Sequence, residues 1–175
     1  MKIKGIDECD FVNYKKPSMF IAFPVCHFKC GRVNCQNSEL ALAPDIEISK
    51  EEICERYISN PITEAFVFGG LDPVDTFMDM ISLIDCIRNK YNIIDDIVIY
   101  TGYTEAEMQK GLFSKDPEVG AHNFKCMIHT YPNIVVKYGR YIPNEGKHFD
   151  KELGVELVSN NQYAIRYNGN LIFNK

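Results

Sequence analysis

Short apolar runs alternate with helical patterns along most of the chain. The runs at 19–25, 65–68, 97–100 and 134–136 are continuous and rich in β-branched and aromatic residues, which predicts buried strands. Between two of them, apolar residues recur at helical spacing, as at Phe77, Ile81 and Ile84. Strands that alternate with helices in this way are typical of a parallel sheet.

Polar residues mark where several helices should begin. Ser49 stands three residues before Glu52, and Thr104 stands three residues before Glu107. In such a capping box the first side chain accepts a hydrogen bond from the backbone of the second residue, whose carboxylate reaches back. Asp72, which precedes a proline, fits an N-cap position. We therefore expect helices to start at these three points.

The end of the chain carries a different pattern. Two strand-like segments, 163–167 and 171–173, flank the turn sequence Asn168-Gly169, which predicts a β-hairpin. The 175 residues fall short of the more than roughly 200 that a closed eight-stranded barrel needs. We expect one α/β domain over 1–175, built as a partial (open) β/α barrel with a C-terminal β-hairpin.

Three unusual segments follow the predicted strands directly. A cysteine-containing loop follows the first strand, Gly69 and Gly70 follow the second, and Thr101 opens a turn after the third. Ligand sites in parallel sheets lie at the carboxyl ends of the strands. The glycines also fit a strand-to-helix turn and Asp72 a helix cap, but their position on one edge favours a shared site.

The loop after the first strand, in the run PVCHFKCGRVNCQN, carries three closely spaced cysteines: Cys26, Cys30 and Cys35. The neighbouring residues are polar, so the segment is a loop rather than part of the core. Three thiolates favour an iron–sulfur cluster with one open iron or, equally on spacing alone, zinc. His27, or Cys126 with His129, would complete a zinc site.

Composition narrows the classes of protein and the cellular compartments that fit this chain. The formal charge of -5 disfavours nonspecific nucleic-acid binding. No apolar run approaches the roughly 20 residues of a membrane span, and the N-terminus lacks the apolar core of a signal peptide. We therefore expect a cytoplasmic protein. Seven cysteines are an odd number, which disfavours a disulfide framework in a reducing compartment and favours metal or redox use.

The order of short motifs resembles one known family over most of the chain. The motifs are DFVN at 10–13, CHFKC at 26–30, CQN at 35–37, FGGLDP at 68–73, IYTGY at 99–103, KYGRY at 137–141 and SNNQ at 159–162. Together they resemble the radical S-adenosylmethionine (SAM) activating enzymes of anaerobic ribonucleoside-triphosphate reductase. The resemblance implies the partial barrel of the radical SAM type.

The chain departs from that family at two places. The second cysteine gap has four residues, whereas the family has two, so Asn34 stands where the family has an aromatic residue that helps to place adenine. Phe28 or a later aromatic residue would then take that role. Leu71 is inserted in the glycine motif. The SAM pocket should therefore differ from that of relatives mainly around the third cysteine.

The resemblance implies the following chemistry. Cys26, Cys30 and Cys35 ligate a [4Fe-4S] cluster, which reduces bound SAM to a 5′-deoxyadenosyl radical, and this radical takes hydrogen from a glycine of anaerobic ribonucleotide reductase. An electron donor such as flavodoxin is also implied. Cluster and cofactor carry the chemistry, so no catalytic acid, base or nucleophile is expected. The implied SAM-binding residues are Phe28, Asn34, Asn37, Gly69, Gly70, Asp72 and Thr101.

Two alternatives remain on sequence grounds. One is a noncatalytic zinc- or cluster-binding module that docks on a larger enzyme, which the longer gap and the inserted leucine motivate. The other is a radical SAM enzyme with a different target. Neither alternative involves direct binding to nucleic acid or a membrane.

Overall fold

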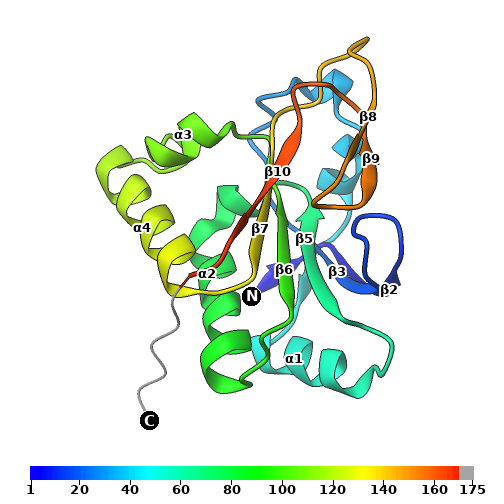
Figure 1. The fold of residues 1–175 in the computed structure, drawn as a ribbon, viewed down its shortest axis with the longest axis vertical. Coiled ribbons are helices and arrows are strands. Elements are labelled where there is room, and N and C mark those ends of the chain that lie inside the picture. The colour runs from blue at the N-terminus through cyan, green and yellow to red at the C-terminus, as the bar shows by residue number, and fades with distance from the viewer. Residues whose placement is uncertain (170–175) are drawn as a thin grey trace.

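The computed structural model describes residues 1–169 and has a six-stranded sheet with helices packed on one face (Figure 1). The strand order is β10-β7-β6-β5-β3-β2, and the four inner strands run parallel. The four inner strands confirm the four strands predicted from the sequence. They are β3 (Ser18–Phe23), β5 (Ala65–Gly70), β6 (Asp96–Tyr100) and β7 (Ile134–Tyr138). The two edge strands are antiparallel to their neighbours and are β2 (Gly5–Asp10) and β10 (Tyr163–Tyr167).

The sheet is open at both edges, with no closed barrel among residues 1–169. At the C-terminal end, β10 forms where the first hairpin strand was expected, and it pairs with β7 so that Tyr163 lies opposite Tyr138. The second expected hairpin strand, 171–173, lies outside the described residues.

The helices occupy the connections between the parallel strands. The α-helices are α1 (Lys50–Ser59), α2 (Phe77–Asp85), α3 (Glu105–Gln109) and α4 (Pro117–Thr130). Shorter turns are the 3-10 helices η1 (Arg32–Asn34), η2 (Ser38–Leu42) and η3 (Pro73–Thr76), and the π-helical turn η4 (Cys86–Lys90), which extends α2.

The predicted helix caps are present, although one is incomplete. Thr104 and Glu107 form the full capping box at α3. At α1 the Ser49 hydroxyl accepts from the Glu52 N–H at 3.0 Å, but the Glu52 carboxylate turns to Arg56 at 2.6 Å instead of reaching back. The hydrogen bond from the Glu52 N–H to the Ser49 hydroxyl therefore caps α1 without the reciprocal bond to the Glu52 carboxylate.

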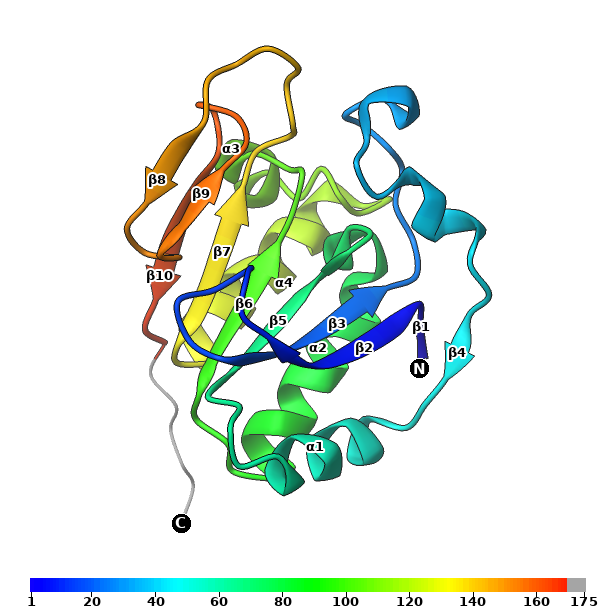
Figure 2. The same ribbon diagram turned by 90° about the vertical axis from the view of Figure 1, so that its right-hand side faces the viewer.

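Side chains along each inner strand alternate between two apolar clusters, as the pleat of a strand requires. In β5, Phe66 and Phe68 pack beneath the helices, whereas Val67 faces the opposite side. The β8–β9 hairpin, formed by β8 (His148–Asp150) and β9 (Val155–Leu157), covers part of that opposite side through Leu153 and Leu157 (Figure 2). Near the carboxyl ends of the strands, this same side opens into a cavity.

A short two-stranded sheet joins the N-terminus to the segment before α1. It pairs β1 (Lys2–Ile3) with β4 (Ile46–Glu47) in antiparallel fashion. Within residues 1–169, no helix combines the length and apolar character needed to cross a bilayer.

Candidate metal centre

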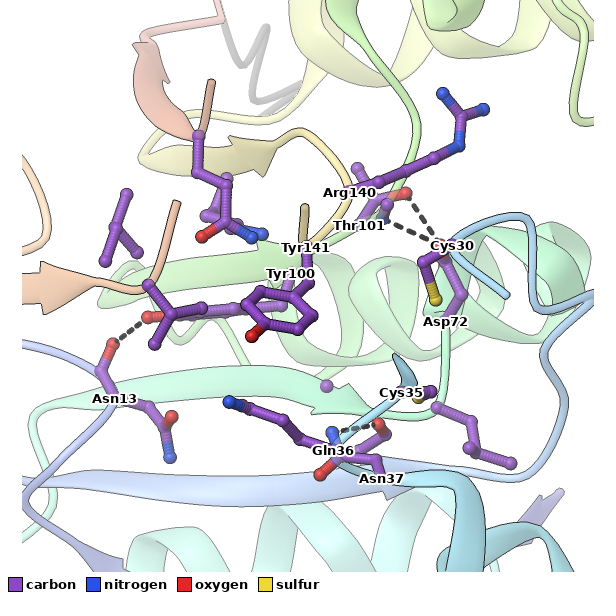
Figure 3. A pocket seen from close by; sticks show the side chains of 18 of the residues that line it. Asn13, Cys30, Cys35, Gln36, Asn37, Asp72, Tyr100, Thr101, Arg140 and Tyr141 are labelled. Atoms are coloured by element: carbon purple, nitrogen blue, oxygen red, sulfur yellow. Dashed lines mark hydrogen bonds between the residues drawn. The ribbon is translucent and has the colours of Figure 1, made fainter. Parts of the chain in front are cut away.

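The three loop cysteines lie on the wall of one cavity of about 520 Å³ at the carboxyl ends of the parallel strands. Cys26, Cys30 and Cys35 are each partly exposed and have reduced thiols. Figure 3 shows the labelled Cys30 beside Asp72. The cysteine loop and the neighbouring strand ends therefore line one cavity, as expected from the sequence.

Cys26 lies near the start of the loop that follows β3. Its Sγ accepts a hydrogen bond from the Phe28 N–H at 3.2 Å. Burial, with the nearby Asp72 and Asp75 carboxylates, raises the pKa of Cys26 to about 11, although backbone N–H groups of Phe28 and Asp72 oppose the shift. Without a bound metal, the neutral thiol of Cys26 is thus favoured over the thiolate. Ligation to a cation must therefore supply the free energy that releases the thiol proton.

Cys30 and Cys35 flank the longer second gap. Burial and the neighbouring Cys35 thiol raise the pKa of Cys30. The residues between them form the 3-10 turn η1, which starts after Gly31 at φ 83° and turns Val33 almost fully into solvent. The additional length is therefore accommodated as an exposed turn, and both cysteines still line the cavity.

The donor set fits a cluster better than a single ion. Among residues 1–169, no three His, Cys, Asp or Glu side chains converge closely enough to hold one metal ion. An iron–sulfur cluster binds each thiolate at a different iron, so its ligands need not converge on one point. The proposed additional zinc ligands do not join the cysteines either, since His27 pairs with Asp75 and Cys126 lies exposed on α4.

An acidic side chain behind the loop anchors it to η3. Asp75, whose side chain is 2 % exposed, accepts from the His27 N–H at 2.6 Å and lies 2.7 Å from His27 Nδ1. The Tyr103 hydroxyl donates to the same carboxylate at 2.7 Å, and Lys29 Nζ lies over the Tyr103 ring at 4.1 Å. These contacts fix the Cys26 end of the loop. They join residues that are far apart in sequence, so the sequence reasoning missed them.

Five of the seven predicted cofactor-binding residues line the cavity: Asn37, Gly69, Gly70, Asp72 and Thr101. Phe28 and Asn34 are not on its wall. The Phe28 ring instead lies 5.3 Å from the Arg32 guanidinium, and Asn34 is exposed at the end of η1. A cofactor role for these two residues stays a prediction, and the present loop conformation does not place them for it.

Packing within the sheet restricts both glycines of the pair and requires glycine at position 70. A Cβ on Gly69 would lie 2.9 Å from the Phe20 ring. Gly70 has φ 78°, and a Cβ there would lie 2.8 Å from Ala22 Cβ and 3.0 Å from Leu40 Cδ2. The Gly70 carbonyl accepts from Asn37 Nδ2 at 2.7 Å, which fastens the segment after Cys35 to β5. The absence of side chains at the two glycines thus lets neighbouring residues pack closely against this part of the cavity wall.

Asp72 joins two of the predicted segments. One carboxylate oxygen caps η3 through the Val74 N–H at 3.1 Å, and the other accepts from Thr101 Oγ1 at 3.0 Å and from the Gly102 N–H at 2.9 Å. Burial and the Asp75 charge raise the pKa of Asp72 to about 6, against these three hydrogen bonds. The N-cap prediction is confirmed, and the same carboxylate holds the Thr101 turn at the cavity.

Sequence reasoning missed several residues that line the cavity, among them Tyr100, Lys137 and Gln162. Lys137 is 7 % exposed, and its Nζ donates to the Gly139 carbonyl at 2.9 Å. A lysine near the carboxyl end of an otherwise apolar strand was the available signal for it. Gln162 gave no such signal, because its burial depends on a contact with a distant segment.

Three thiols from the loop after the first parallel strand thus line a cavity at the carboxyl edge of an α/β sheet, an arrangement that can hold a metal centre. A family model described as a 4Fe-4S single cluster domain matches residues 18–137, which is more than half of the chain. The chain belongs to this family and is an iron–sulfur protein. No curated protein and no solved structure matches the chain.

Proposed function

We propose that the protein is a radical SAM enzyme with a partial β/α barrel, which uses a [4Fe-4S] cluster to install a glycyl radical on anaerobic ribonucleotide reductase. The observation that carries this proposal is the shared cavity. Three cysteines from one loop and the glycine, Asp72 and Thr101 segments from two neighbouring strands line it together. Three protein thiolates leave one iron of a four-iron cluster without a protein ligand, next to open space.

The chain supplies the ligands and the cavity, and the bound groups supply the reaction. Cys26, Cys30 and Cys35 would hold the cluster as thiolates. When bound, the cluster and SAM supply the electron transfer and carbon–sulfur cleavage that yield a 5′-deoxyadenosyl radical. The electron itself would come from an external donor such as flavodoxin.

The polar residues of the wall are suited to the methionine part of SAM. Lys137 keeps N–H donors beyond its bond to Gly139, and within residues 1–169 it has no other hydrogen-bond acceptor. Its ammonium would therefore pair with the methionine carboxylate. Asp72 already accepts three hydrogen bonds, so a cofactor ammonium would share its oxygens with these donors.

Anaerobic reconstitution tests the proposal directly. Protein loaded with iron and sulfide, then given SAM and a strong reductant, should release 5′-deoxyadenosine. Cys26→Ala, Cys30→Ala or Cys35→Ala should abolish release, whereas Cys54→Ala should retain it because Cys54 is buried in the helix-side core. Fully loaded protein that releases none would refute the radical chemistry and leave a noncatalytic cluster-binding module.

A second measurement tests the target. Incubation of the loaded protein with an anaerobic ribonucleotide reductase should produce the doublet electron paramagnetic resonance signal of a glycyl radical. Release of 5′-deoxyadenosine without this signal would support a radical SAM enzyme with a different target.

A further inference from the structure

The outer surface of α4 carries two side chains of types that ligate metals. His122 and Cys126 stand four residues apart, a spacing that puts both on one face of a helix. Both residues are exposed, and Cys126 Sγ lies 3.4 Å from His122 Nε2. Phe124 and Met127 pack in the helix-side core, which turns the pair toward solvent. The imidazole partner of Cys126 is therefore His122 rather than His129, the partner expected from the sequence.

The separation of these two atoms matches that of two ligands on one zinc ion. Zinc bonds are about 2.3 Å long to a thiolate and about 2.0 Å long to an imidazole nitrogen. At a tetrahedral angle these lengths place the sulfur and the nitrogen about 3.6 Å apart. Since Sγ and Nε2 are already 3.4 Å apart, both can ligate one ion with little movement, and the thiol gives up its proton to solvent.

Solvent would supply the other ligands of the ion. Among residues 1–169, no third His, Cys, Asp or Glu side chain joins the pair. His122 also lines a second cavity of about 370 Å³, together with Gln109 of α3 and Phe124. This space leaves room beside the imidazole for water molecules. A four-coordinate ion held by the pair would therefore keep two positions for exchangeable ligands.

The donor atoms and their place in the fold narrow the kind of metal. A thiolate with an imidazole suits zinc, whereas Mg²⁺ and Ca²⁺ prefer oxygen ligands. The pair is also separate from the three loop cysteines. The α4 helix packs on the helix side of the sheet (Figure 1), and in the described chain none of its residues lines the cysteine cavity. A zinc ion on α4 would therefore not compete with the cluster for ligands.

We propose that His122 and Cys126 form a second metal site, a zinc chelate that spans one turn of α4. The site does not depend on the radical chemistry proposed above. The two ligands come together only when the helix is folded, so zinc bound there also stabilises α4.

Alkylation of Cys126 tests the site at a single residue. Cluster-loaded protein, in which the cluster occupies the loop cysteines, is treated anaerobically with iodoacetamide over a range of Zn²⁺ concentrations. Mass spectrometry of the peptide that contains Cys126 then gives the extent of modification. Zn²⁺ should slow alkylation of Cys126 because the sulfur is engaged by the metal, whereas Mg²⁺ should not. Cys9, a partly exposed thiol on β2, is the internal control and should react equally with and without Zn²⁺.

Two histidine variants identify the second ligand. His122→Ala should raise the Zn²⁺ concentration for half protection at least about ten-fold, because loss of a residue that only orients a ligand already costs that much. His129→Ala removes another exposed imidazole of α4 and should leave protection unchanged. No protection in the wild type, equal protection in His122→Ala, or lost protection in His129→Ala would overturn the proposal. None of these outcomes depends on release of 5′-deoxyadenosine, so failure of the zinc site and failure of the proposed function are distinguished.

Discussion

The imidazole Nδ1 of His27 lies 2.7 Å from Oδ1 of Asp75, and the backbone N–H of His27 donates to the other carboxylate oxygen at 2.6 Å. This pair ties the residue immediately after the first cysteine to the turn that begins α2. The Cys26 end of the loop is therefore held by side chains outside it, whereas the Arg32–Asn34 turn is held by its own backbone bonds, such as Cys35 N to Arg32 O at 3.3 Å.

We expect Asp75→Ala to loosen the Cys26 end of the loop. The change removes two acceptors from His27 and leaves the Tyr103 hydroxyl without its partner, at a cost of about 2 kcal/mol in unfolding free energy. Hydrogen exchange of the metal-free protein should accelerate at residues 27–31, and iron incorporation should fall. Asp79→Ala, at an exposed position on the adjoining helix α2, is the control. Unchanged exchange in Asp75→Ala would contradict the anchoring role.

Serine at any one of the three loop cysteines should reduce cluster binding strongly, because each thiolate would serve a different iron. Cys126→Ser, which changes an exposed thiol on α4, should bind iron and sulfide as the wild type does. Iron and sulfide analysis with visible absorption after anaerobic reconstitution checks both. Full loading of a protein that lacks one loop cysteine would show that another residue takes its place.

Acid should destabilise the protein through Asp96. Burial opposes ionisation, but hydrogen bonds from Arg166, Lys16 and Tyr14 lower the pKa of Asp96 to about 2. An unfolded aspartate titrates near about 3.9, so the ionised folded state gains about 2 kcal/mol that is present above that pH and is lost as the pH falls toward 2. Urea midpoints between neutral pH and pH ~3 should fall more steeply in the wild type than in Asp96→Asn. Parallel pH profiles would contradict this assignment.

Arg88 should be essential for stability. Its side chain is fully buried and donates to the backbone carbonyls of Ile93, Asp95 and Pro132 at 2.6, 2.9 and 3.0 Å. Arg88→Met leaves these carbonyls unpaired and should cost roughly 3 kcal/mol or more. Arg88→Lys should recover little, because an ammonium cannot reproduce the planar array of donors. Equilibrium denaturation measures both; near wild-type stability in Arg88→Met would contradict this role.

The features that the sequence predicted well are local. The strand runs and the Thr104 and Asp72 caps depend on residues a few positions apart, and they appear as expected. The joint location of the cysteine loop and the Gly69 and Thr101 segments followed from one rule on parallel strands. These parts of the fold and site needed no knowledge of long-range packing.

The features that escaped prediction depend on contacts between distant segments. Gln162 is buried where its amide donates to the Gly139 carbonyl, and the β8–β9 hairpin covers the sheet through Leu153, which no local pattern marks. The glycine pair was predicted to bind a cofactor and lines the cavity, but its close contacts with Phe20 and Ala22 could not be predicted from the sequence. Such constraints appear only once the strands are set in register.

The alternation of side chains along the strands places the residues of the main core and the residues of the cavity wall on opposite faces of the sheet. Residues at 19, 21, 66, 68, 97, 99, 134 and 136 pack under the helices, whereas those at 20, 22, 69, 100 and 137 line the cavity. Substitutions in the second set, with the exception of Gly69, can therefore change what the cavity accepts while the main core keeps its packing. A single-residue insertion in β7, by contrast, would exchange Lys137 with an apolar neighbour and damage both faces together. In this fold, single substitutions on the cavity side can change ligand preference, whereas a change in strand length would also disrupt the main core.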